Sequence, residues 1–107
     1  MSESDKLKLG QLYAQDSWHM EACIIGNKEG LLELRDAIDV ALQKKIGVAH
    51  LFPADYEGYE TYVALVDEDE VFESLCLPYR DEYAQSEENA LDPFDIVKQY
   101  EKEKGQK

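Results

Sequence analysis

The sequence predicts a small α+β protein: a two-layer sandwich with a three-stranded mixed sheet of β-α-β-β order, backed by one long helix, with further C-terminal helices. Three features lead to this expectation. Residues 18–23 alternate in polarity as a half-buried strand does, and Ile24 and Ile25 extend the strand as an apolar end. Residues 28–45 carry apolar side chains at helical spacing, and residues 48–52 and 59–66 are two β-rich runs separated by a turn.

The first strand and the long helix are joined by a tight turn at residues 26–30. The strand alternates from Trp18 onward, which predicts one buried and one exposed face. Gly26 lets the chain turn, and Asn27 is a strong N-cap candidate because its side chain can accept a hydrogen bond from a first-turn amide. Gly47 is the expected C-cap. The apolar stripe that we expect to face the sheet consists of Leu31, Leu32, Leu34, Ile38, Ala41 and Leu42.

Two further strands follow this helix. The run from Val48 to Phe52 stops at Pro53, and residues 59–66 are rich in β-branched and aromatic side chains. Turn-forming residues at 54–58 predict an antiparallel hairpin. Because a helix connects the first strand to the second, we expect those two strands to be parallel neighbours joined by a right-handed crossover.

Three segments are expected along the chain. Residues 1–17 are predicted to be a polar N-terminal arm, residues 18–83 an α+β core, and residues 84–107 an acidic linker followed by a C-terminal helix. A short helix is expected after the acidic run at residues 67–70. Pro93 suits the first turn of the last helix.

The net charge of −13 is concentrated in one part of the chain. Residues 53–92 carry thirteen acidic residues against Arg80 alone, a net charge of −12. Phosphates would be repelled, so we expect no direct nucleic-acid binding. A basic protein partner is favoured electrostatically. The alternative is that the acidity serves only solubility.

The protein is expected to be cytoplasmic. Its first six residues lack the apolar segment of a signal peptide, and no apolar run reaches membrane-spanning length. Cys23 and Cys76 lie in apolar stretches without a Cys-x-x-Cys spacing. We therefore expect buried free thiols in place of a disulfide.

The sequence carries no catalytic or cofactor signature, so we expect neither an enzyme nor a bound cofactor. Residues 26–30 are bounded by glycines but lack the patterns of phosphate-binding loops. One alternative ligand face consists of His19, Glu21 and His50, provided that the first two strands pair. Its spacing does not match a metal site, and we expect no metal.

Tyrosines and carboxylates are interleaved in the acidic part of the chain. Aromatic anchors with selective charges are typical of protein-binding surfaces, whereas a tyrosine beneath the helix would belong to the core, and both roles can hold at once. The predicted partner-binding residues are Asp55, Tyr56, Glu57, Tyr59, Asp69, Glu70, Tyr79, Asp81, Glu82 and Tyr83.

The strand–turn–helix unit also resembles known sequences. Its pattern is Trp18-His19-x-Glu21, then Gly26-Asn27-x-Glu29-Gly30-Leu31-x-x-Leu34-Arg35-x-Ala37-Ile38, then Glu57-Gly58-Tyr59 and Leu77-Pro78-Tyr79. This pattern resembles a group of small uncharacterised bacterial proteins and is similar to predicted immunity proteins of bacterial polymorphic-toxin systems. The resemblance covers about residues 18–80. Its motifs are structural, so it implies a binding role and supplies no active site.

Two functions are compatible with these features. The first is a non-enzymatic acidic binding protein, of the inhibitor or immunity type, that covers a basic site on a toxin or a nucleic-acid-binding protein. The second is a small-molecule or nucleotide-signal binding domain in a homo-oligomer, which would use the face of His19, Glu21 and His50. The unpaired edges of a small sheet would also permit a homodimer.

Overall fold

The computed structural model describes residues 7–15, 20–78 and 90–105. In chain order the elements are β1 (Gly10–Tyr13), β2 (Cys23–Gly26), α1 (Lys28–Lys44), β3 (Ile46–Leu51), β4 (Tyr59–Ala64), α2 (Asp69–Ser74) and α3 (Pro93–Gly105). The predicted α+β class is confirmed. The predicted three-stranded mixed sheet is wrong, because the described strands form two antiparallel pairs, β1–β2 and β3–β4.

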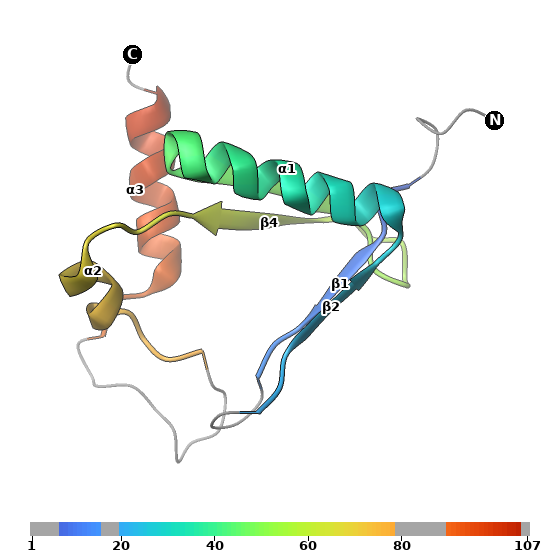
Figure 1. Ribbon diagram of the computed structural model, residues 1–107, viewed down its shortest axis with the longest axis horizontal. Coiled ribbons are helices and arrows are strands. Elements are labelled where there is room, and N and C mark those ends of the chain that lie inside the picture. Colours follow the sequence, from blue (N-terminus) through green and yellow to red (C-terminus); the bar gives the residue numbers. More distant parts are fainter. Residues whose placement is uncertain (1–6, 16–19, 79–89, 106–107) are drawn as a thin grey trace.

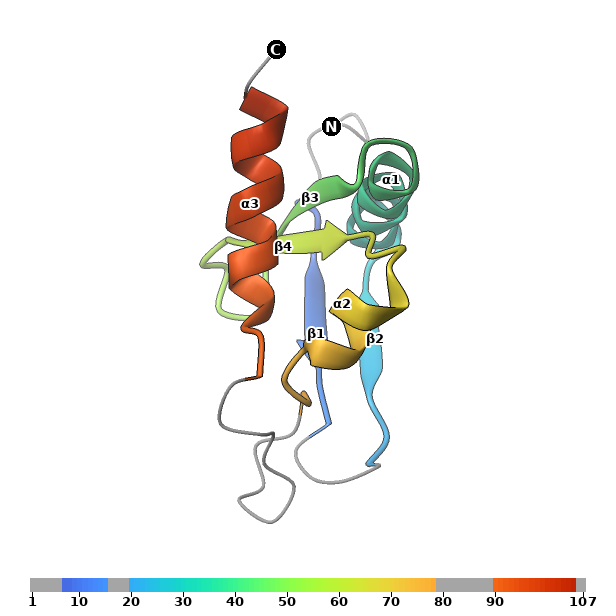
Figure 2. The same ribbon diagram turned by 90° about the vertical axis from the view of Figure 1, so that its left-hand side faces the viewer.

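The β3–β4 hairpin lies between two helices. Helix α1 covers one face of the hairpin and α3 crosses the other (Figures 1 and 2). Alternation along β3 explains why both faces are covered, since neighbouring residues point to opposite sides. Ala49 and Leu51 pack with Leu34 of α1, while Ile46 points the other way and is also buried. This part of the molecule therefore has three layers, where we predicted two.

The hairpin itself is confirmed as antiparallel, with Ile46 opposite Ala64 and Leu51 opposite Tyr59. The Leu65 N–H donates to the carbonyl of Lys45 at 2.8 Å. Hydrogen-bonded pairs alternate along an antiparallel ladder. The backbone groups of His50 therefore point away from β4, toward the free edge of β3.

The position of β2 differs from our prediction. β2 pairs with β1, a segment that we expected in a polar arm, and Tyr13 lies opposite Cys23. Leu9 forms a parallel bridge with Phe52, so the N-terminal segment takes the place beside β3 that we expected for the first strand. Residues 20–23 are all exposed, and their alternating polarity has no buried face. Residues 16–19 lie outside the described residues.

Helix α1 begins as predicted and ends differently. The Asn27 side chain accepts a hydrogen bond from the Gly30 N–H at 2.7 Å, which confirms the N-cap. The C-cap is Lys45, at a left-handed φ of 77°, and its N–H donates to Ala41. Gly47 lies within β3, where a Cβ would collide with the carbonyl of Ala37.

The face that α1 buries is rotated from the predicted stripe. Its buried residues are Gly30, Leu34, Ala37 and Ala41. Leu31, Ile38 and Leu42, which we expected in the core, are 46%, 43% and 62% exposed. The physical reason is the close approach at Gly47, because a helix that presents small residues packs nearer to the strands than one that presents leucines.

The C-terminal helices follow local signals. Asp69 and Glu70 occupy the first turn of α2, and Pro93 is the first residue of α3, as predicted. The Asp92 carboxylate accepts a hydrogen bond from the Phe94 N–H at 2.9 Å. No helix among the described residues is both long and apolar enough to cross a membrane.

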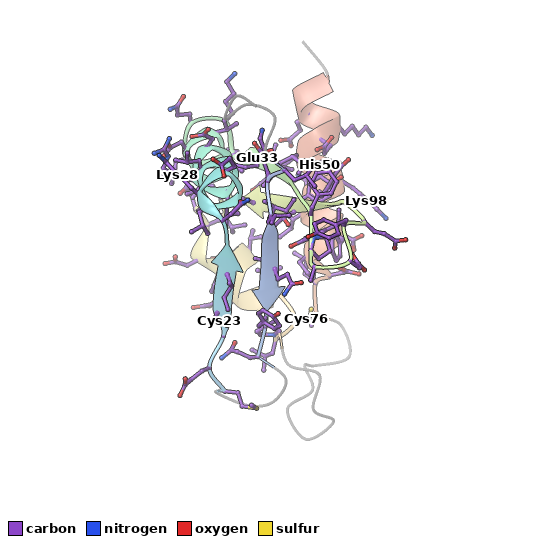
Figure 3. The ribbon with its side chains drawn as sticks, turned by 90° about the vertical axis from the view of Figure 1, so that its right-hand side faces the viewer. Cys23, Lys28, Glu33, His50, Cys76 and Lys98 are labelled. Carbon is purple, nitrogen blue, oxygen red and sulfur yellow. The ribbon has the colours of Figure 1, made fainter. Side chains whose placement is uncertain are left out.

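Glu33 lies beside the edge of β3 that does not pair with β4. Its Oε2 accepts the outward-pointing N–H of His50, and its Oε1 accepts a hydrogen bond from Lys8 Nζ, both at 2.9 Å. Figure 3 shows Glu33 and His50 on neighbouring elements. The bond from the His50 backbone, together with the Lys8 ammonium, holds the pKa of Glu33 below its ordinary value of 4.5. Charged Glu33 therefore joins α1, β3 and the N-terminal segment.

We expect Glu33→Gln to lower the free energy of unfolding by about 1 kcal/mol at pH 7. A carboxylate with a lowered folded-state pKa stabilises the protein above its unfolded-state pKa, and this stabilisation is lost as pH falls through the folded-state pKa. The difference between wild type and variant should thus shrink toward acid pH in urea unfolding experiments. Asp39→Asn, an exposed carboxylate of the same helix, is the control. A difference that stays constant down to acid pH would contradict this assignment.

Candidate functional site

The predicted partner-binding residues that the structure describes lie apart from one another, in the turn between β3 and β4, on β4 and on α2. Asp55, Tyr56 and Glu57 lie together in the turn between β3 and β4, which we call the acidic turn (residues 53–58). Asp69 and Glu70 lie on α2, at the opposite end of the hairpin (Figure 1). Tyr79, Asp81, Glu82 and Tyr83 lie outside the described residues. The acidic turn is therefore the one place where the described part of the chain brings the predicted tyrosine and carboxylates together.

Hydrogen bonds within the acidic turn give it a defined shape. The Tyr56 N–H donates to the carbonyl of Pro53 at 2.9 Å. The Asp55 carboxylate accepts the Glu57 N–H at 3.0 Å, an Asx turn that aspartate readily forms. At Gly58 a Cβ would come within 2.9 Å of the Phe52 ring, so a larger residue where the chain enters β4 would displace that ring. The Asp55 carboxylate and the backbone of Glu57 are thus held on either side of Tyr56.

Tyr56 is both exposed and strained. Its side chain is 63% exposed, and its backbone has a left-handed φ of 62°. For a residue with a Cβ this conformation costs about 1–2 kcal/mol. An exposed tyrosine held in such a conformation gains no compensating burial of its own. Strain of this kind concentrates at binding and catalytic sites.

An apolar groove of about 300 Å³ lies beside Tyr56. It separates the acidic turn from the β1–β2 ribbon (residues 10–13 and 23–26), and its described lining carries no charged side chain. The groove is large enough for one apolar side chain of a partner, with Asp55 and Glu57 near its rim. Its lining residues are Leu9, Gly10, Gln11, Ile25, Gly26, Asn27, Phe52, Pro53, Ala54 and Tyr56.

Gln11 fixes the two walls of the groove relative to one another. Its Oε1 accepts a hydrogen bond from the Ala54 N–H at 2.7 Å, and its amide group also contacts the Tyr13 hydroxyl. Sequence reasoning did not identify Gln11 or Ile25 as site residues. No local pattern marks them, because both become site residues only when the N-terminal segment reaches Phe52.

Tyr59 packs against the core, which is the other role that we considered for the tyrosines. It is half-buried against the cluster of Leu34 and Leu51, and its hydroxyl donates to the carbonyl of Gly10 at 2.8 Å. This tyrosine therefore anchors the root of the ribbon.

The alternative ligand face is not assembled among the described residues. Glu21 precedes β2 of one sheet, while His50 lies on β3 of the other, and His19 lies outside the described residues. Figure 3 shows Cys23, close to Glu21 in sequence, well away from His50. Within the described residues, no three His, Cys, Asp or Glu side chains gather in a way that could hold a metal ion.

The cysteines are free, as expected, but Cys23 is exposed and Cys76 is half-buried. The prediction that both would be buried is wrong for Cys23, because β2 belongs to a ribbon that projects from the body (Figure 1).

A second hollow, of about 380 Å³, lies between α3, α2 and the end of β4. Carboxylates from Asp67, Glu68, Asp95 and Glu103 border it, and Lys45 Nζ lies 5.9 Å from the centre of the Tyr100 ring. The Tyr100 hydroxyl donates to the carbonyl of Leu65 at 3.0 Å, which ties α3 to the hairpin. This hollow lies where α2 and α3 pack near the end of the hairpin, and its border is acidic.

Comparison with known proteins adds no identification: no family model, curated protein or solved structure matches the chain. The resemblance to immunity proteins therefore remains a prediction.

The strain at Tyr56 gives a direct test of its role. Tyr56→Gly removes the Cβ clash, while the flexibility of glycine in the unfolded chain offsets part of the gain. We expect Tyr56→Gly to be more stable than Tyr56→Ala by about 0.5–1 kcal/mol in urea unfolding. If the two variants are equally destabilised, the ring of Tyr56 serves the fold and the left-handed backbone carries no strain.

Proposed function

We propose that this protein is a non-enzymatic binding protein that covers a basic site on a protein partner through the acidic turn and the adjoining groove. The observation that carries the proposal is the exposed, strained Tyr56 beside an apolar groove and two carboxylates. An aromatic anchor beside a pocket, surrounded by selective charges, is how protein interfaces concentrate binding energy.

Charge supports a basic partner. The acidic turn lies in the segment of residues 53–92, whose net charge is −12. Such a surface accelerates encounter with a cationic site and repels nucleic acid. An inhibitor or immunity-type protein, acting in the cytoplasm, would use this surface to occupy a cationic active site or a nucleic-acid groove. The free thiols of Cys23 and Cys76 suit a reducing compartment.

Two matched charge reversals test the proposal. Asp55→Lys/Glu57→Lys and Asp69→Lys/Glu70→Lys change the net charge equally, but only the first alters the acidic turn. The immobilised chain captures partners from a host lysate at low and high salt, and the affinity of the purified partner is then measured for each variant. We expect the turn variant to lose about tenfold or more in affinity and the α2 variant to bind nearly as wild type does.

The outcomes separate the alternatives. Equal losses in both variants would mean that overall acidity, and not the turn, attracts the partner. Unchanged affinity and unchanged salt dependence in both variants would refute the proposed site.

A further inference from the structure

We propose that a second copy of this chain covers the β1–β2 ribbon, with β2 of one copy paired against β2 of the other. The ribbon shares Ile25 and Gly26 with the lining of the groove, but Ile24, where the interface is tested, lies outside that lining, so the test does not depend on the partner proposed above.

The ribbon exposes large apolar side chains on both of its faces. Leu12 and Tyr13 on β1 are 41% and 49% exposed, and Ile24 and Ile25 on β2 are 54% and 61% exposed. Because successive strand residues point to opposite sides, each strand presents one of these side chains to each face. Single exposed apolar residues are ordinary, whereas four on an eight-residue ribbon mark a covered surface.

A two-stranded ribbon of this length is marginal in water on its own. Near its root it is fastened to the body through Leu9, Gly10 and Gln11, while no described residue hydrogen-bonds to the backbone of its outer edge. The Asn27 N–H donates to Leu9, so by alternation the backbone groups of Ile24 and Gly26 point away from β1. The Gly10 N–H, which by the same alternation points away from β2, does bond to Phe52. The open edge of β2 is therefore ready to accept another strand.

The charge of the ribbon favours a second copy over the basic partner. Residues 7–15 and 20–26 contain one lysine, Lys8, and one acid, Glu21, so this region is neutral in a chain of net charge −13. A basic protein would find a single carboxylate here, that of Glu21, in a region without net charge. Two copies that meet through their ribbons would keep their acidic segments, residues 53–92, outside the contact.

Symmetry agrees with this assignment. Antiparallel pairing of β2 with itself is compatible with a two-fold axis and gives the four-stranded order β1-β2-β2-β1.

Two lysine substitutions at comparably exposed positions test the interface. Ile24→Lys places a charge at the open edge of β2 and does not touch the lining of the groove. Leu42→Lys makes the same change on α1, at a side chain that is 62% exposed. Sedimentation of the full chain over a wide concentration range should show a dimer for wild type and for Leu42→Lys. Ile24→Lys should raise the dimer dissociation constant about a hundredfold or more, because the axis places the charge in the interface twice.

The position of the contact is tested with spin labels on Cys23 in a Cys76→Ser background. Neighbouring strands lie about 4.8 Å apart, and a four-residue strand is about 13 Å long, so the labelled sites should lie within about 15 Å of each other. The proposal would be overturned if the wild-type protein is a monomer, or if the dimer survives Ile24→Lys with its circular dichroism unchanged. A distance between the two Cys23 labels much longer than about 15 Å would overturn it as well.

Discussion

The side chain of Asn27 joins three parts of this structure that are distant in sequence. Its Oδ1 accepts hydrogen bonds from the N–H groups of Gly30 and Leu9, at 2.7 and 3.0 Å. Its amide nitrogen donates to the carbonyl of Leu7 at 2.9 Å. Leu9 then bridges Phe52, so one residue caps α1, holds the N-terminal segment and sets the ribbon against the hairpin. The junction requires glycine at position 30, where a Cβ would collide with the Leu9 carbonyl.

Both proposed surfaces depend on this junction. Asn27 and Leu9 line the groove beside Tyr56, so the site exists only while the N-terminal segment stays in place. The same junction fastens the ribbon near its root, and the side chains of Ile24 and Ile25 beyond it stay more than half exposed. The fold therefore exposes two surfaces of different character. One is acidic, and the other is neutral and apolar. The two surfaces are suited to different occupants.

Local signals in the sequence were sufficient for some elements and insufficient for others. The N-cap at Asn27, the β3–β4 hairpin and the first turn of α3 each follow from a few adjacent residues. Strand β1 does not. Its position is decided by the contact of Leu9 with Phe52, two residues that are far apart in the sequence. The buried face of α1 was missed because the small residues that face Gly47 lie next to the leucine stripe that periodicity favours. The carboxylates and tyrosine of the acidic turn were recognisable, but the groove was not, since its other wall comes from the N-terminal segment.

Amide hydrogen exchange on Asn27→Asp tests the central role of the junction most directly. The aspartate can still accept the Gly30 N–H and cap the helix, but it has no donor for the Leu7 carbonyl and would repel it. Faster exchange in β1 and β2, with α1 as protected as in wild type, is the predicted result. Unchanged protection of the ribbon would mean that Asn27 is a helix cap and nothing more, and the account of both surfaces would lose its basis.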